Sequence, residues 1–588
     1  MVLDDPIAVS HELTELQTRL LEVAGEEHVG PHLRVHELQL AEVEGRHEIA
    51  KAAQSQRPLD PHQAHRAHVA KGGVLEEEIH GHRVWQIRQA AEMLDDPVAL
   101  AANDDRDALD TGVGQPPHHA LDHGHAADGQ HRFRCCECGR KQSCTLSARL
   151  DQSMNAGRDR ERSWRHGRLT IAVLGGTGVG TPTLIDAVAT AVQAGLLPRT
   201  ELRLHGREMI RARGLIRYAC QTSPGVSAEG DPATLVREAP TLEESLKGCD
   251  VVLCLVRPGG MAGRAADERM VLAEGLPGDE GIGPSGLASY LRSRPVLESI
   301  KTAWQSHAPH APFLQLTSPL GLATGHIARE GGMVLGLCEL PQTTSRAIRS
   351  AVEPTFGPIS HAHFGLNHCA WLYDFKDRDG RDRTADVIRI CGQCSLLPLD
   401  TEQALQDGAV PLPPLRMLYD TSAVVREQLA RPVTRGEELI EWCSALHDAY
   451  CTPGGVDVGF VSSMLARRRM DWHLEAVVPA LEAWCNELPA RLTVNVDGIV
   501  PGVVVEAPCI VGKVGIDPVG QEPLPPGPDR LFQQLTTYER AVLALPQEST
   551  ARDIAEVLEL HPLVSTAALA LRLGERIIEG LVEGRSCS

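Results

Sequence analysis

The pattern of apolar and polar positions is clearest between residues 171 and 192. Ile171 and Val173 belong to a short apolar run, which is typical of a strand buried on both faces. Leu184 and Val188 then follow at helical spacing. The pattern predicts a strand, a turn and a helix in succession.

Glycines fill the turn between this strand and this helix. Without side chains they let the backbone turn sharply and let a ligand approach it closely. We expect Thr181 to cap the helix, whose unpaired N–H groups favour a bound phosphate. No Lys-Ser/Thr pair follows, so the motif is not a P-loop; it indicates a dinucleotide site or merely a tight turn. The glycines are Gly175, Gly176, Gly178 and Gly180.

Other short apolar runs, separated by helical patterns, occur at residues 201–204, 249–256, 313–316 and 333–337. This alternation is typical of an open parallel sheet. We therefore predict an α/β fold, with a Rossmann-like parallel-sheet domain over residues 166–335. A mixed α/β domain is expected over residues 336–588.

Residues 1–165 differ in composition from the rest of the chain. They are rich in His, Ala, Asp and Arg and carry too little apolar surface to offset the entropy of ordering. We predict a disordered extension, with helices at most at Leu13–Val23 and Val84–Met93, or a native start further on, near Met154. A zinc site is less favoured, because no second pair at finger spacing completes its cluster. The cluster is Cys135, Cys136, Cys138 and Cys144.

Charge and composition narrow the possible partners. The chain of 588 residues has a formal net charge of −21, which argues against nucleic acid or an anionic membrane as its partner. No apolar run reaches the roughly 18–20 residues of a membrane span, and no signal-peptide pattern opens the chain. We therefore expect a cytoplasmic protein. Its 16 cysteines are then expected to be free thiols, small buried residues or ligands. Cys391 and Cys394 follow an apolar run at residues 387–390 that indicates a strand, so we expect buried thiols rather than a redox pair.

The second strand lacks one expected feature of a dinucleotide site. An acidic residue normally ends this strand and holds the ribose hydroxyls. Here His205 and Gly206 stand at that position. Arg203 and Arg207 suit the 2′-phosphate of NADP, or are simply solvated charges.

Several segments carry a resemblance when they are taken in order along the chain. IAVLGGTGVGTPTLI opens the series at residue 171, VRPGGMAGRAADERMVLAEGLPGDEGIGPSG and LTSPLG follow, and GLCELP and GLNH come next. VNVDGIVPGVVVEAPCIV and HPLV lie nearer the C-terminus. Together they resemble glycoside hydrolase family 4, the NAD- and divalent-metal-dependent glycosidases that include 6-phospho-glucosidases. The resemblance spans residues 168–583.

The resemblance implies a reaction. NAD takes a hydride from C3 of the sugar, and the resulting ketone acidifies the proton on C2. A divalent metal, Mn²⁺ in the family, stabilises the charge that develops when a base removes that proton. Elimination of the leaving group, addition of water and return of the hydride complete the hydrolysis. The substrate would be a glycoside or sugar phosphate, and the enzyme a homodimer or homotetramer.

The resemblance also implies roles for individual residues. Cys338 and His368 would hold the metal, and Glu339 would act as the acid. Gly175, Gly176, Gly178, Val179, Thr181 and Arg257 would bind NAD, although NADP is not excluded. Arg264, Ser318, Asn367 and Arg435 would contact the substrate.

The chain departs from the family pattern at three positions. Ser318 replaces an Asn, and Gly281 replaces a Thr. Pro414 stands where the family has its tyrosine base, which leaves Tyr419 or a metal-bound hydroxide as the base. We therefore expect weak or altered glycosidase activity. A non-catalytic nucleotide- or sugar-binding homologue and an NAD(P)-dependent oxidoreductase are the alternatives.

Overall fold

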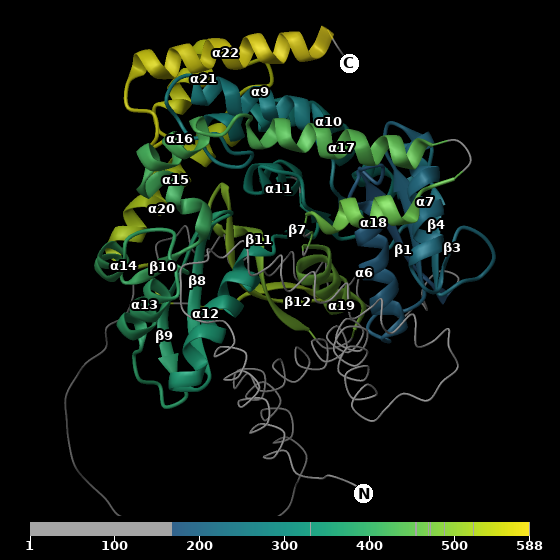
Figure 1. Cartoon of the computed structure of the whole chain (residues 1–588), viewed down its shortest axis with the longest axis horizontal. Coiled ribbons are helices and arrows are strands. Elements are labelled where there is room, and N and C mark those ends of the chain that lie inside the picture. Colours follow the sequence, from purple (N-terminus) through teal and green to yellow (C-terminus); the bar gives the residue numbers. More distant parts are fainter. Residues whose placement is uncertain are drawn as a thin grey trace, which may run out of the picture. The chain divides into compact units, whose positions relative to one another are not determined.

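A computed structural model describes most of the chain after residue 166 (Figure 1). The expected extension over residues 1–165, its two helices, its cysteine cluster and the start near Met154 lie outside the described residues. No helix in the described part of the chain has the length and apolarity to cross a membrane. The described residues are 167–329, 331–452, 455–468, 470, 472–486, 489–520 and 522–586.

One sheet of thirteen strands runs through the described residues, in the order β10-β9-β8-β12-β11-β7-β6-β5-β1-β2-β4-β3, with β13 against β12. Strands β1 to β7 pair in parallel, whereas every pairing that involves β8 to β13 is antiparallel. The predicted parallel sheet and the mixed part that follows it are confirmed. The strands are β1 Leu169–Leu174, β2 Thr200–His205, β3 Val226–Ser227, β4 Thr234–Glu238, β5 Val251–Cys254, β6 Phe313–Gln315, β7 Val334–Gly336, β8 Ile359–Leu366, β9 Cys369–Asp377, β10 Ala409–Pro411, β11 Ala490–Val500, β12 Val503–Gly512 and β13 Gly515–Pro518.

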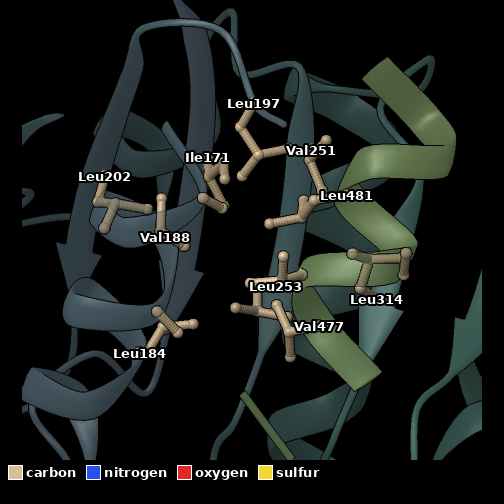
Figure 2. Packing of buried hydrophobic residues seen from close by; sticks show 14 of the residues in the cluster. Ile171, Leu184, Val188, Leu197, Leu202, Val251, Leu253, Leu314, Val477 and Leu481 are labelled. Atoms are coloured by element: carbon tan, nitrogen blue, oxygen red, sulfur yellow. The ribbon is translucent and has the colours of Figure 1, made fainter. Parts of the chain in front are cut away.

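Helices cover both faces of the parallel strands, as the continuous apolar character of these strands requires. On one face, Ile171 and Leu253 pack against Leu184 of α6 (Thr181–Gln193) and Leu481 of α19 (Val478–Cys485). Figure 2 shows these side chains directed toward one another between strands and helices. On the other face, Trp304 and other residues of α10 (Gly283–His307) and α11 (Leu320–Ala328) cover the alternate strand residues.

The remaining helices follow the same principle of burying one apolar side. Helices α9, α10, α20, α21 and α22 contribute to one shared apolar cluster. The helices are α7 Met209–Thr222, α8 Leu242–Leu246, α9 Gly260–Leu272, α10 Gly283–His307, α11 Leu320–Ala328, α12 Leu340–Phe356, α13 Thr384–Gln393, α14 Thr401–Asp407, α15 Arg416–Tyr419, α16 Thr421–Leu429, α17 Arg435–Cys451, α18 Val458–Ala466, α20 Pro526–Ala544, α21 Ala551–Leu558 and α22 Ala567–Ser586, with short helices η2 Pro413–Leu415 and η3 His473–Val477.

Two local expectations are wrong. The cap of α6 is Gly180, which makes no side-chain hydrogen bond, and Thr181 is the first helical residue. Residues 387–390, which precede Cys391, belong to helix α13 and not to a strand. Their β-branched residues lie on the buried side of an amphipathic helix, and this packing overrides their β-propensity. Cys391 is buried, whereas Cys394 is exposed.

Candidate active site

The glycine turn after β1 is closed by the second strand. The amides of Gly175 and Gly176 both donate to the carbonyl of His205, at 2.9 and 2.8 Å. Gly175 has φ +88°, and a Cβ there would lie 2.8 Å from the carbonyl carbon of Leu255. These two glycines are therefore required by the packing of the turn itself.

Gly178 differs from them, because a Cβ at this position would meet only the carbonyl oxygen of Gly175, at 3.4 Å. Protein packing alone does not demand a glycine there. An absent side chain that the protein does not need leaves room for a ligand, as a pyrophosphate resting on the turn would require. The turn thus fits the expected dinucleotide.

The packing of Thr177 explains why no acidic residue stands at Gly206, where a dinucleotide site normally has one. A Cβ on Gly206 would lie 2.3 Å from Oγ1 and 3.0 Å from Cβ of Thr177. The threonine in the turn therefore occupies the space that an acidic side chain at Gly206 would need.

C-terminal residues cover the same turn. The hydroxyl of Tyr450 in α17 donates to the carbonyl of Val179 at 3.1 Å. Nδ1 of His473 lies 2.8 Å from the hydroxyl of Thr183, and a Cβ on Gly180 would come within 2.7 Å of the Met470 sulfur. Residues far apart in sequence therefore support the start of α6.

Two of the predicted arginines share one half-buried carboxylate, that of Glu280. Arg257 and Arg264 donate to Oε2 of Glu280 at 2.5 and 2.8 Å, and Arg264 also donates to Glu268 at 2.7 Å. Burial alone would raise the pKa of Glu280, but the two guanidinium groups outweigh it and hold that pKa at about 2. The carboxylate therefore stays charged and fixes both arginines.

Two further arginines lie around this pair. Arg435 begins α17, and the amide of the next residue donates to the Glu268 carboxylate that also binds Arg264, at 2.7 Å. Arg468 lies between the rings of Trp442 and Trp472, at 5.6 and 5.5 Å from their centroids. Burial lowers the pKa of Arg468, and nearby Arg257, Arg264 and Arg435 lower it further, whereas Glu280 opposes them. The four arginines lie near one another, and carboxylates pair with three of them. Glu280 binds Arg257 and Arg264, and Glu438 binds Arg435 at 2.6 Å.

His368 lies in the turn between β8 and β9 with φ +64°, a rare conformation for a residue with a side chain. Its Nδ1 is buried and has no hydrogen-bond partner among the described residues. A Cβ on Gly281 would lie 3.5 Å both from this nitrogen and from the Ser318 hydroxyl. The same Cβ would lie 3.5 Å from Oδ1 of Asp279, so polar atoms of three residues surround the position of the family threonine, and one of them is an unpartnered imidazole nitrogen.

Cys338 follows β7 and is buried. Burial raises the pKa of its thiol well above the usual value, and the nearby carboxylates of Glu506 and Glu339 raise it further. The side chain of Asn367 lies near the sulfur and opposes this shift in the pKa. Cys338 and Asn367, which were predicted to bind the metal and the substrate, therefore lie close together.

Glu339, the predicted acid, and Tyr419, the predicted base, lie in different surroundings. Glu339 caps α12 directly after Cys338. The Tyr419 hydroxyl donates to Asp407 at 2.6 Å and accepts from the Trp371 indole at 3.2 Å. Burial and the Asp407 carboxylate raise the pKa of Tyr419, which disfavours it as a base. Both catalytic roles stay predictions.

Two models of protein families match the chain. The model described as family 4 glycosyl hydrolase matches residues 216–353, and its C-terminal domain model matches residues 363–564. The chain belongs to glycoside hydrolase family 4.

Curated and solved family 4 proteins resemble it along most of their length. A probable 6-phospho-beta-glucosidase of Bacillus subtilis is 24% identical over 435 residues, which are 70% of this chain and 96% of the relative. A 6-phospho-beta-glucosidase of Thermotoga maritima, solved with NAD and glucose-6-phosphate, has a TM-score of 0.61 at 20% identity. The match covers 71% of this chain and 99% of that chain. A 6-phospho-alpha-glucosidase from gut microorganisms, solved with NAD and Mn²⁺, gives 0.58 at 18% identity and covers 71% and 98%.

The residues of this family 4 chain fit a divalent metal at Cys338 and His368. The buried Nδ1 of His368 lacks a partner, and a buried thiol lies in the same network of polar groups. Among the described residues no group of three or more His, Cys, Asp or Glu side chains is arranged to hold an ion. Two protein ligands would leave several coordination positions for substrate oxygens and water.

Sequence reasoning missed two features of the site in this family 4 chain. Arg468 belongs to an Arg-Arg-Arg run between two tryptophans, a signal that was visible but has no fixed spacing to the other arginines. Glu506, which binds Asn367, sits in an apolar strand about 140 residues further along the chain. Only the pairing of distant strands brings it to the site.

Proposed function

We propose that this chain is an NAD- and divalent-metal-dependent glycosidase that hydrolyses 6-phospho-glucosides. The observation that carries the proposal is the buried, unpartnered Nδ1 of His368 beside Gly281 and the Ser318 hydroxyl, in a family 4 fold. The 6-phospho-glucosidases among its relatives support the substrate class. A homodimer or homotetramer in the cytoplasm stays part of the proposal.

Bound NAD would supply a hydride acceptor, and a metal such as Mn²⁺ a Lewis acid for the sugar oxygens. The residues that would hold NAD are Gly176, Gly178 and the start of α6, with the room left at Gly178 as support. Cys338 and His368 would hold the metal. The assignment of Val179, Thr181 and Arg257 to the cofactor is proposed on the same grounds.

The chain's own arginines suit a phosphorylated sugar. Arg264, Arg435 and Arg468 would bind the 6-phosphate, while Glu280 keeps Arg257 and Arg264 from moving apart. Ser318, whose hydroxyl donates to the Glu280 carbonyl at 3.2 Å, would contact the sugar, as would Asn367. Glu339 is proposed to protonate the leaving group.

Removal of the C2 proton is the weakest step of the proposed reaction. A positioned base typically supplies roughly 10²–10⁴-fold, and the hydrogen-bonded Tyr419 is poorly suited to accept a proton. We therefore propose slow turnover that rises with pH. Deuterium at C2 should give a primary isotope effect, because proton removal then limits the rate.

The experiment is turnover of nitrophenyl glucosides with and without a 6-phosphate, in the presence of NAD and Mn²⁺. The proposal expects hydrolysis of the phosphorylated substrate and no net NADH. Net NADH would instead indicate an oxidoreductase. Tight NAD binding without hydrolysis of any glycoside would favour a non-catalytic binding protein.

A further inference from the structure

Glu506 is the most deeply buried carboxylate near the candidate metal site, with no solvent exposure. Its Oε2 accepts hydrogen bonds from the amide nitrogens of Asn367, at 3.1 Å, and Asn495, at 3.2 Å. Its Oε1 lies 3.0 Å from Nε2 of His363. A buried carboxylate is costly unless donors satisfy it, and here three side chains do so.

These groups lie where the antiparallel strands join the parallel ones. Glu506 on β12 is in register with Asn495 on β11 and with Gly365 on β8, and Asn495 is in register with Gly336 on β7. A Cβ on Gly336 would come within 2.8 Å of the Asn495 side chain, so the glycine is needed for this close approach. Gly365, Glu506, Asn495 and Gly336 thus form a row across the four neighbouring strands β8, β12, β11 and β7.

The two candidate metal ligands are attached to the two ends of this row. His368 comes directly after Asn367, which follows β8, and Cys338 lies two residues beyond Gly336. The Asn367 amide donates to Glu506 at 3.1 Å, and it also lies close enough to the Cys338 thiol to lower the pKa of that thiol. An amide nitrogen carries two hydrogens, so it can serve both acceptors. Two ligands from strands that are not neighbours are thereby connected by one side chain.

We propose that Glu506 is a positioning residue, which holds the Asn367 amide and, through it, the relative placement of Cys338 and His368. This inference rests on the proposed metal site. Groups that orient metal ligands typically affect metal affinity about 10–100-fold when they are removed. What Glu506 supplies is a hydrogen-bond acceptor at Oε2, where both asparagines donate.

The acceptor role makes a specific prediction about two variants. Glu506→Leu removes the acceptor at similar volume and should weaken Mn²⁺ binding about 10–100-fold. Glu506→Gln can keep its carbonyl oxygen toward both asparagines and turn its amide toward His363, and should restore Mn²⁺ affinity to within about threefold of the wild type. Titration of the full chain with Mn²⁺, followed by electron paramagnetic resonance, measures both.

Two controls separate positioning from general loss of stability. Glu274→Leu removes a carboxylate that pairs with Arg572 and Arg576, away from the site, and should lower the melting temperature without changing Mn²⁺ affinity. Co²⁺ in place of Mn²⁺ reports the thiolate bond by its absorption, which should weaken in Glu506→Leu. If Glu506→Leu does not fold, Asn367→Ala breaks the same link and should weaken Mn²⁺ binding about tenfold.

Each outcome decides between the proposals. Unchanged Mn²⁺ affinity in folded Glu506→Leu or Asn367→Ala would overturn the positioning role while leaving the metal site in place. A Glu506→Gln variant as weak as Glu506→Leu would also overturn it, because the charge and not the acceptor would then matter. A wild-type chain that binds Mn²⁺ no better than Cys338→Ser would refute the metal site and this inference together.

Discussion

The glycine turn and the end of the sheet with the proposed metal ligands Cys338 and His368, called the metal end below, are built in opposite ways. At the turn, the amides of Gly175 and Gly176 bind the second strand, and the absent side chain of Gly178 leaves room beside the main chain. At the metal end, the Glu506 carboxylate orders polar side chains that come from different strands. One site is therefore made by the main chain, and the other by a network of side chains.

This difference determines which kinds of substitution each of the two sites tolerates. A surface made by the main chain depends on a few positions where no side chain is allowed, and other residues around it can vary. A buried network depends on every member, because one lost partner leaves the others unsatisfied. The missing acid at Gly206 belongs to the turn, and the departures Gly281 and Ser318 lie beside His368. Cys338, Asn367 and His368 themselves match the motifs of the family.

The largest effect is expected at the metal end. Cys338→Ser should reduce Mn²⁺ affinity by about 100-fold or more, because a ligand is lost and not only its support. Isothermal titration calorimetry with Mn²⁺ measures it. Cys391→Ser changes another buried thiol in α13 and should leave Mn²⁺ affinity unchanged. Equal affinities in the two variants would contradict the assignment.

A comparable loss is expected at the turn, but for NAD alone. Gly178→Val should weaken NAD binding by about 100-fold, since the side chain would fill the space left for the pyrophosphate. The melting temperature should fall little, because the added Cβ meets only one atom at 3.4 Å. Gly520→Val, where a Cβ meets nothing, is the control. Retained NAD affinity would show that the ligand does not approach this glycine.

A smaller effect is expected at the arginine cluster between the two sites. Arg468→Gln should raise the KM for a 6-phospho-glucoside about tenfold, the value of one charge-assisted hydrogen bond. The KM for the unphosphorylated glucoside should not change. Arg467→Gln, at the exposed neighbouring residue, serves as the control. An equal rise for both substrates would mean that Arg468 acts through packing against its two tryptophans.

A second buried carboxylate contrasts with the satisfied Glu506. Burial raises the pKa of Glu539 to about 8, and its Oε2 has no partner among the described residues. Between the unfolded pKa near 4.5 and about pH 8 the folded chain retains this proton and the unfolded chain releases it, so the free energy of unfolding falls as pH rises. Glu539→Gln should therefore melt about 2 °C or more above the wild type at pH 8, with a smaller gain at pH 5. A calorimetric difference that does not depend on pH would contradict the raised pKa.

The smallest difference is expected between the two dinucleotides. Without an acid at Gly206, the affinities for NAD and NADP should lie within about tenfold of each other. Competition calorimetry measures the ratio. A preference for NAD of 100-fold or more would reveal a ribose contact supplied by another residue.

The sequence predicted those parts of the molecule that depend on local pattern. Strand β1, the glycine turn and helix α6 follow from residues 171–192, because buried strands and amphipathic helices have short repeats. The motifs around Cys338 and His368 pointed to their sites through a family resemblance. The helix over residues 387–390 was missed, since a short apolar run does not distinguish a strand from a buried helix face.

The side-chain network could not be predicted in this way. Asn367 and Glu506 are 139 residues apart, and no spacing in the sequence links them. Their contact depends on the order of β8, β12, β11 and β7 in the sheet, which only the folded chain specifies. A carboxylate inside the apolar run of β12 was nevertheless a visible signal, because such a residue needs buried donors.

The contact between Thr177 and Gly206 constrains how this chain can evolve. A Cβ at Gly206 meets Oγ1, Cγ2 and Cβ of Thr177 at 2.3, 2.7 and 3.0 Å, so rotation of the threonine cannot clear the space. An acid at Gly206 would therefore fit only if the backbone of one of the two residues moved. Replacement of Thr177 by alanine removes the two shorter contacts, so the chain should accept an acid at Gly206 more easily after that change than before it.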